Sequence, residues 1–180
     1  MSKPKIQKEA IFRILENIFG TGSVQKEVSY NWMASPGKMD DAGEYTNIIQ
    51  SLVNYRNKIE FVKTHKPNCD FVIESKKIIV EYDERQHFSE ARKIALEAYP
   101  SNVMLFFDKE KWIEYCEKIN AKDNDPHFRD EQRAFYDSVR DIASDKNGYN
   151  LYRIKDNEFD WTSKDAESKM RYLLSIREEK

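Results

Sequence analysis

Two short apolar runs joined by a tight turn constrain the fold of this chain more than any other stretch. They lie within residues 67–88, PNCDFVIESKKIIVEYDERQHF. The pattern predicts a strand over 69–74, a turn near Ser75 and Lys76, and a second strand over 77–83. Both runs are rich in β-branched and aliphatic residues, as a buried pair of strands requires. These residues are Val72, Ile73, Ile78, Ile79 and Val80.

Acidic residues stand at the two ends of this apolar hairpin. Asp70 lies at its entrance, and Glu81 and Asp83 lie at its exit. Glu81 and Asp83 are two apart in a strand and therefore point the same way, while Asp70 can converge on them from the neighbouring strand. Buried charges are costly unless they are paired. Carboxylates grouped in this way form an oxygen-rich pocket that suits a hard cation such as Mg²⁺.

An ordinary alternative exists for such a strand, because many acidic strands lie at a sheet edge with a solvated face. The run KIIV before Glu81 favours a central strand instead, where water does not reach the carboxylates. His87 follows Asp83 by four residues, just past the expected strand end, so its ring can meet water. Its ordinary pKa near neutrality makes it a candidate general acid or base.

The pattern Asp70, Glu81-Tyr82-Asp83, Gln86-His87 resembles the PD-(D/E)xK nuclease superfamily. The closest resemblance is to the branch of very-short-patch repair and Glu-Asp-x-His-Asp homing endonucleases. In that branch a metal-ligating Asp precedes a strand similar to I-E-x-D-G-x-Q-H, and Glu84 here stands in the place of the Gly.

A second match follows downstream, where the branch has an Arg-Asp pair opening a helix, a Gly-containing turn and a strand ending in Arg-Ile. Arg129-Asp130, Asn147-Gly148 and the run LYRI ending at Arg153-Ile154 fit this order. Residues 89–127, between the two matches, are interpreted as a helical insertion.

The resemblance implies a fold and a reaction. The expected fold is a single α/β domain over 1–180, with a restriction-endonuclease-like mixed β-sheet core flanked by helices on both faces. The implied activity is that of a metal-dependent DNA endonuclease, in restriction, mobile-element or repair service. Asp70, Glu81 and the carbonyl of Tyr82 would ligate Mg²⁺, for which Mn²⁺ would substitute.

The resemblance also implies roles for the other site residues. Asp83 would bind a second ion or orient the attacking water, and His87 would transfer a proton. Asp130 would hold His87 in one tautomer or ligate metal through water. The residues expected to contact DNA are Lys63, Lys66, Gln86, Arg129 and Arg133.

Composition limits the other classes of protein. The 180 residues carry a net charge of −2, which disfavours a protein that coats nucleic acid by bulk attraction. No run approaches a membrane span, and the N-terminus lacks an apolar signal core. Cys69 and Cys116 make no disulfide framework. We therefore expect a cytoplasmic, reduced protein that does not bind membranes, and double-strand cutting would require a homodimer.

Hydrophobic spacing predicts the remaining elements. Helices are expected over 5–19, 44–55, 89–99, 109–119, 128–143 and 166–176. Further strands are expected over 24–33 (or an extended arm), 59–62, 102–107 and 149–154.

Two alternatives to a nuclease stay open: a nucleic-acid-binding member of the same fold that no longer cuts, and an interaction module with an acidic patch. The set Asp70, Glu81, Asp83 and His87 speaks against the first, because loss of activity normally removes at least one such residue. His65 and Cys69 are four apart, but no second pair completes a zinc site.

Overall fold

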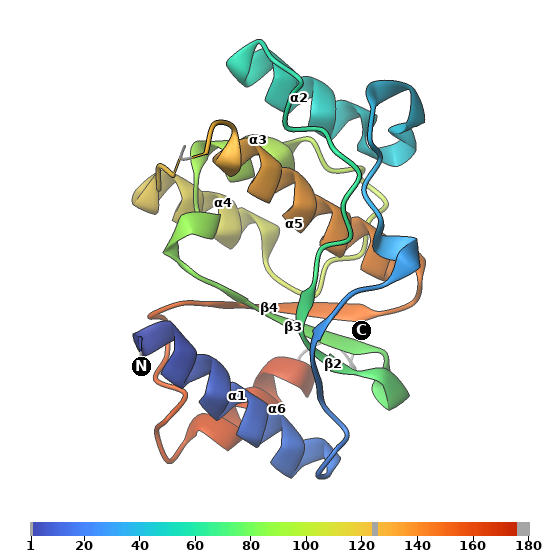
Figure 1. Cartoon of the computed structure of the whole chain (residues 1–180). Helices are drawn as coiled ribbons and strands as arrows, with labels where there is room; N and C mark the ends of the chain where they lie inside the picture. Colours follow the sequence, from blue (N-terminus) through green and yellow to red (C-terminus); the bar gives the residue numbers. More distant parts are fainter. Residues whose placement is uncertain (1, 124–125, 176–180) are drawn as a thin grey trace.

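The computed structural model describes residues 2–123 and 126–175. A mixed four-stranded sheet runs through the molecule in the order β1 (Gln25–Val28), β2 (Cys69–Ile73), β3 (Ile78–Asp83) and β4 (Asn150–Lys155). β1 and β2 are antiparallel, as are β2 and β3, whereas β3 and β4 are parallel. The predicted hairpin is therefore central, because β2 and β3 each have a strand on both sides (Figure 1).

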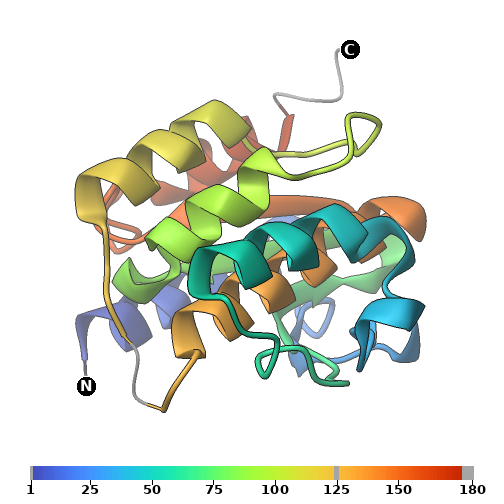
Figure 2. The same cartoon turned by 90° about the horizontal axis from the view of Figure 1, so that it is seen from above.

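Helices cover both faces of this sheet (Figures 1 and 2). α1 (Lys3–Phe19) and α6 (Ala166–Ser175) lie on one face. The other face carries α2 (Thr46–Arg56), α3 (Glu90–Glu97), α4 (Lys109–Ile119) and α5 (Arg129–Lys146). The mixed α/β class and the helices on both faces are as the sequence predicts.

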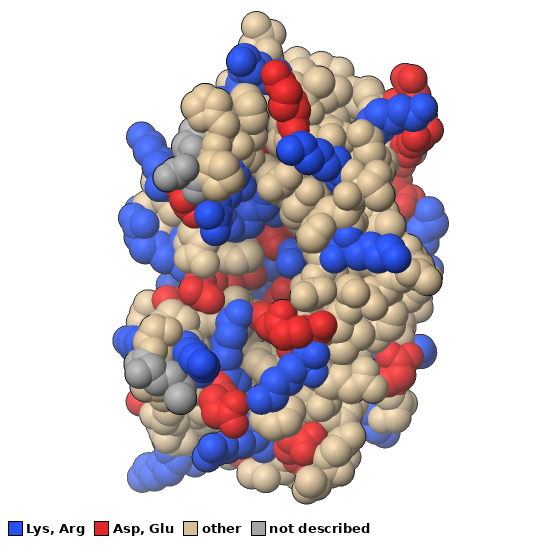
Figure 3. Space-filling view, viewed as in Figure 1, with Lys and Arg blue, Asp and Glu red and all other residues tan. Residues whose placement is uncertain are grey.

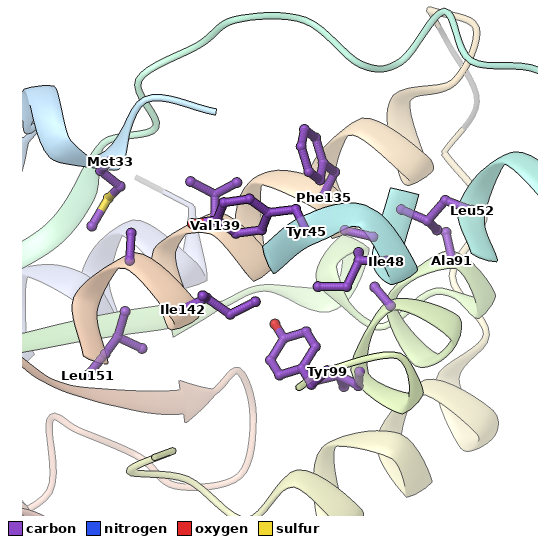
Figure 4. Close-up of a cluster of buried hydrophobic side chains, with 14 of the residues drawn as sticks. Met33, Tyr45, Ile48, Leu52, Ala91, Tyr99, Phe135, Val139, Ile142 and Leu151 are labelled. Carbon is purple, nitrogen blue, oxygen red and sulfur yellow. The ribbon is translucent and has the colours of Figure 1, made fainter. Parts of the chain in front are cut away.

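The alternation of side chains along β3 divides the apolar interior into two cores. Ile79 packs into the larger core beneath α2–α5, while Ile78 and Val80 pack into the smaller core beneath α1 and α6. Figure 4 draws part of the larger core, with Phe135, Val139 and Ile142 of α5 among side chains from α2, α3 and β4. The sheet is therefore dry on both faces over the first half of β3.

The segment interpreted as an insertion is helical and belongs to the larger core. Ser89 caps α3 by accepting a hydrogen bond from the backbone N–H of Arg92, and Asp108 caps α4 in the same way through Lys111. Leu96 of α3 and Trp112 of α4 are buried in that core. α3 and α4 therefore contribute to the hydrophobic core of the domain and are not a peripheral addition to it.

Two strand predictions are wrong. Residues 59–62 form a turn, closed by a hydrogen bond from the Val62 N–H to the Ile59 carbonyl (2.9 Å). Residues 102–107 are irregular, and Phe107 is buried against Trp112. In both segments the apolar residues fill the core without joining the sheet, and short apolar runs do not distinguish these outcomes.

The remaining differences concern boundaries. Of the predicted strand or arm over 24–33, only Gln25–Val28 pairs with β2, and Asn31–Met33 is a 3₁₀ turn. Further 3₁₀ turns lie at Met39–Asp41 and Gly43–Tyr45. Ile176 of the last predicted helix, and Asn124 and Asp125 of the segment interpreted as an insertion, lie outside the described residues. None of the described helices is long and apolar enough to cross a membrane.

Candidate active site

The candidate site forms where backbone pairing between β2 and β3 gives way to hydrogen bonds between side chains and backbone. Their backbone register runs from Ile73–Ile78 to Phe71–Val80. Beyond it, side chains take part: the Asp70 N–H donates to Glu81 Oε1 (3.1 Å), and the Tyr82 N–H donates to Asp70 Oδ2 (2.8 Å). Each carboxylate thus accepts a backbone N–H of the other strand. The structure brings Asp70 and Glu81 together, as the sequence predicts.

A basic side chain reaches this carboxylate pair from each face of the sheet. Lys8 of α1 places Nζ 2.9 Å from Asp70 Oδ1 and 3.7 Å from Glu84 Oε1. Arg140 of α5 places Nε 3.5 Å from Glu81 Oε2 and donates to the Asn68 carbonyl. Neither cation was predicted from the sequence, because each comes from an element distant along the chain.

The site lies at the surface, level with the sheet. Figure 3 shows acidic side chains in a hollow across the middle of this face, between the helices above the sheet and those below it, with Lys and Arg side chains around them. The Asp70 side chain keeps 14% of its area exposed and that of Lys8 keeps 29%. A phosphate or a hydrated ion can therefore reach Asp70.

Burial dominates the electrostatics of Glu81, whose residue is only 4% exposed. Desolvation raises its pKa to about 8; Arg140 lowers it, while the charge of Asp70 raises it further. At Lys8, burial lowers the pKa, but the charge of Asp70 and the hydrogen bond to it outweigh burial, so the pKa rises. Burial thus makes the ionised form of Glu81 costly, and Arg140 offsets that cost only in part.

Asp83 has separate partners, although it lies two residues from Glu81. It accepts hydrogen bonds from Trp112 Nε1 (2.8 Å) and Arg153 Nη1 (2.6 Å). Within the described residues, no three or more His, Cys, Asp or Glu side chains are grouped so as to hold a metal ion. The expected pocket of three carboxylates is therefore a pair, Asp70 and Glu81, with Asp83 engaged in an ion pair beside it.

His87 has a carboxylate partner that the sequence did not identify. Its Nδ1 lies 2.8 Å from Asp137 Oδ2 and 3.8 Å from Asp83 Oδ1. Burial raises the pKa of Asp137, but His87 and Arg153 outweigh burial and hold it well below its usual range. Since the His87 side chain is 21% exposed, its ring remains accessible to solvent while Asp137 fixes its orientation.

The structure does not bring Asp130 to His87. Asp130 accepts hydrogen bonds from Arg133 Nη1 (3.1 Å) and from the Asp123 N–H (2.9 Å). Asp137 lies seven residues, or two helical turns, further along α5 and takes the role that we assigned to Asp130. The two aspartates share a helix face, so spacing alone did not distinguish them.

A buried ionic network supports these groups from below. Arg153 donates through Nε to Asp141 Oδ1 (2.9 Å) and through Nη2 to the Asp137 carbonyl (3.2 Å). Arg92 and Tyr99 donate to Asp141 Oδ2. Two features of the sequence accompany this network: an Arg within the apolar strand 149–154, and acidic and basic residues spaced three and four apart along α5.

The residues expected to contact DNA fall into two groups. Arg129 and Arg133 both pair with Asp123 (3.3 and 2.8 Å), and Arg133 Nη1 also donates to the Gln86 carbonyl, close to His87. Lys63 and Lys66 are exposed, and Lys66 donates to Asn31 Oδ1. The structure therefore places Gln86 and Arg133 near the candidate site.

The zinc alternative finds no support in the geometry of its two residues. Cys69 is fully buried, with Sγ 3.6 Å from Met33 Sδ. His65 is exposed and packs against Tyr136, with ring centroids 4.6 Å apart.

Comparisons with family models, with curated proteins and with solved structures each give no match for this chain. A functional assignment therefore depends on the geometry of the site.

Proposed function

We propose that this chain is a Mg²⁺-dependent DNA endonuclease that hydrolyses phosphodiester bonds. The observation that carries the proposal is the Asp70–Glu81 pair. Two carboxylates from adjacent central strands meet at the surface hollow, each bound to the other strand's backbone. Such a pair places negative charge where it is costly, and a divalent cation offsets that cost.

The donor set fits a hard divalent ion. Asp70, Glu81 and the carbonyl of Tyr82 would hold Mg²⁺ or Mn²⁺ through oxygen atoms, the ligands that these ions prefer. The raised pKa of Glu81 also fits, because a bound dication favours the ionised carboxylate. When bound, the ion supplies Lewis acidity toward a phosphate and lowers the pKa of a coordinated water.

The remaining steps, which are proton transfer and positioning of the phosphate, would fall to side chains of the protein. His87, oriented by Asp137 through Nδ1, leaves Nε2 to transfer a proton to or from the reacting oxygens. Lys8 brings an ammonium to Asp70 and is close enough to attract a phosphate or orient a water there. Asp83 acts as a positioning residue, because it holds Arg153 under Asp137.

The arrangement of elements also supports this function. α1 precedes three antiparallel strands, with α2 between the first and the second, and α3, α4 and α5 lead to the parallel fourth strand, so that helices lie on both faces of the sheet. This order agrees with the restriction-endonuclease-like fold that the motif resemblance implies. DNA would contact Gln86, Arg129 and Arg133 beside His87, together with the exposed Lys63 and Lys66, and a homodimer would cut both strands in the cytoplasm.

One observation favours a second function. Lys8 and Arg140 already neutralise part of the carboxylate charge, as they would in a protein of this fold that binds nucleic acid without cutting it. A DNA-cleavage assay distinguishes the two functions, because only the endonuclease would cut DNA.

Supercoiled plasmid incubated with the protein and Mg²⁺ or Mn²⁺ provides the test. We expect nicked or linear product that is lost in EDTA and in Asp70→Asn, and retained in the matched control Asp165→Asn, an exposed aspartate just before α6. DNA binding without cleavage would establish the second function. No cleavage of plasmid, single-stranded DNA or RNA, with no metal-induced rise in Tm, would leave an interaction module.

A further inference from the structure

A cavity of about 480 Å³ lies beside the candidate active site, at the open edge of the sheet. Arg153, Ile154 and Lys155 of the edge strand β4 line it, together with residues of α4 and α6. Cavities that bind small molecules typically measure about 300–1,000 Å³. This one is therefore large enough for a ligand, and nothing in the proposed reaction uses it.

Aromatic side chains line the cavity in two pairs from different parts of the chain. Phe107 and Trp112 lie at the start of α4, with ring centroids 5.2 Å apart. Phe159 and Trp161 lie between β4 and α6, with centroids 5.1 Å apart. Protein aromatic rings stack on nucleobases with little regard to sequence, because every base has a π face. The lining therefore suits a flat aromatic ligand.

The same cavity carries positive charge available to an anion. Lys111 is bound to Glu158, and Arg153 to buried carboxylates. Lys155 and Lys169 also line the cavity, and neither forms a salt bridge within residues 2–123 and 126–175. Lys155 donates to the Asp156 carbonyl (3.0 Å), and its charge also acts on Glu158 of the cavity wall. A phosphate in the cavity would form a direct ion pair with both ammonium groups.

The cavity and the candidate active site share two residues. Trp112 and Arg153 line the cavity, and both donate to Asp83, whose Oδ1 lies 3.8 Å from His87 Nδ1. A ligand in the cavity is therefore separated from His87 by the buried contacts of Trp112 and Arg153 with Asp83.

We propose that this cavity binds a nucleobase together with its own phosphate, the base among the aromatic pairs and the phosphate at Lys155 and Lys169. The assignment of that nucleotide to the substrate rests on the proposed nuclease function. Two sources share this chemistry, a free mononucleotide and an unstacked nucleotide of a DNA strand. In the second case the cavity would select strands from which a base can be extruded.

The first experiment titrates the whole protein with deoxynucleoside 5′-monophosphates and follows tryptophan fluorescence, since two of the three tryptophans line the cavity. We expect saturable quenching, with deoxynucleosides and 2-deoxyribose 5-phosphate binding at least tenfold more weakly. Lys169→Ala should weaken nucleotide binding about tenfold, corresponding to about 1.4 kcal/mol. The matched control Lys164→Ala, an exposed lysine near the same helix but outside the cavity, should bind as wild type does.

The second experiment identifies the source. A short single-stranded oligonucleotide and an abasic counterpart with the same phosphates are compared by fluorescence anisotropy in EDTA. If a strand nucleotide is the ligand, the complete oligonucleotide binds several-fold more tightly, and Phe159→Ala, verified as folded by circular dichroism, removes the preference. Mononucleotide binding without that preference assigns the cavity to a free nucleotide.

The outcomes separate this proposal from the nuclease itself. Plasmid cleavage with neither mononucleotide binding nor base preference overturns the cavity proposal alone, as does equal weakening by Lys169→Ala and Lys164→Ala. Nucleotide binding that persists in wild type and in Asp70→Asn, with no cleavage by either, keeps the cavity as a nucleotide site and rejects the nuclease.

Discussion

The two halves of β3 are stabilised in opposite ways. Ile78, Ile79 and Val80 bury apolar side chains in the cores on both sides of the sheet. Glu81 and Asp83 are equally buried, at 4% and 2% exposure, but their partners are arginines and backbone N–H groups. One strand thus passes from hydrophobic packing to ion pairing within six residues.

The difference shows what the second half contributes. Apolar burial lowers the free energy of folding directly, whereas a buried ion pair often contributes little net stability and becomes strongly destabilising once a partner is removed. Replacing Glu81 and Asp83 together with their partners Arg140 and Arg153 by apolar residues of similar volume would therefore be neutral or favourable for folding. The charged half of β3 is therefore better explained by the proposed chemistry than by a contribution to stability.

The largest expected effect comes from breaking the charged half at Arg153. Arg153→Met leaves Asp83 and Asp141 without their shared guanidinium, and we expect a loss of about 3–5 kcal/mol in the free energy of unfolding. Urea denaturation measures it. The control Arg171→Met, which breaks an exposed pair with Glu167, should cost less than about 0.5 kcal/mol. Equal losses of stability in Arg153→Met and Arg171→Met would mean that leaving the buried carboxylates unpaired carries no extra desolvation cost.

Breaking the apolar half at Ile79 should have a somewhat smaller effect. Ile79→Ala leaves a cavity in the larger core, at an expected cost of about 3 kcal/mol, and Ile79→Val should cost about 1 kcal/mol. Unlike Arg153→Met, neither change leaves a buried charge. A larger loss in the free energy of unfolding for Ile79→Ala than for Arg153→Met, measured by the same urea denaturation, would contradict the expected order.

The third prediction separates chemistry from folding in the charged half. His87→Gln keeps a polar group at a partly exposed position, so stability should change by less than about 1 kcal/mol. The proposed proton transfer is lost, and the rate of DNA cleavage should fall by about 10²-fold or more, with loss of one limb of the pH–rate profile. An unchanged rate would remove His87 from the reaction.

Glu81 gives the charged half a dependence on pH. Burial raises its pKa in the folded protein to about 8, above the ordinary value of 4.5. Between these values the folded state binds more protons than the unfolded state, so stability falls as pH rises through this window. Glu81→Gln should flatten the curve, and we expect the two proteins to diverge by on the order of 2 kcal/mol at pH 8. Tm measured from pH 5 to pH 8.5 tests this, and parallel curves would contradict it.

Sequence reasoning succeeded where the signal was local. The apolar runs located β2 and β3, and helical spacing located the six helices, because burial repeats along each element. The carboxylate pair Asp70 and Glu81 was also predicted, since a hairpin brings its two strands together. The partners of that pair, Lys8 and Arg140, and the partner of His87, Asp137, were not predicted, because they come from helices whose docking depends on the whole fold. Asp130 illustrates the limit: the helix that reaches His87 was identified, but the turn of that helix was not.

The smallest expected effect concerns Lys8, the most exposed partner of the carboxylate pair. Lys8→Met should lower stability by less than about 1 kcal/mol, because solvent screens the Lys8–Asp70 pair. Its larger consequence should appear with Mn²⁺, since the ammonium competes with a dication for Asp70. We therefore expect Mn²⁺ to raise the Tm of Lys8→Met more than that of wild type, corresponding to a several-fold gain in affinity. Lys5→Met, an exposed change on the same helix, controls for lost surface charge. Equal increases of Tm with Mn²⁺ in all three proteins would mean that Lys8 does not compete with a cation at Asp70. The Lys8–Asp70 ion pair would then be purely structural.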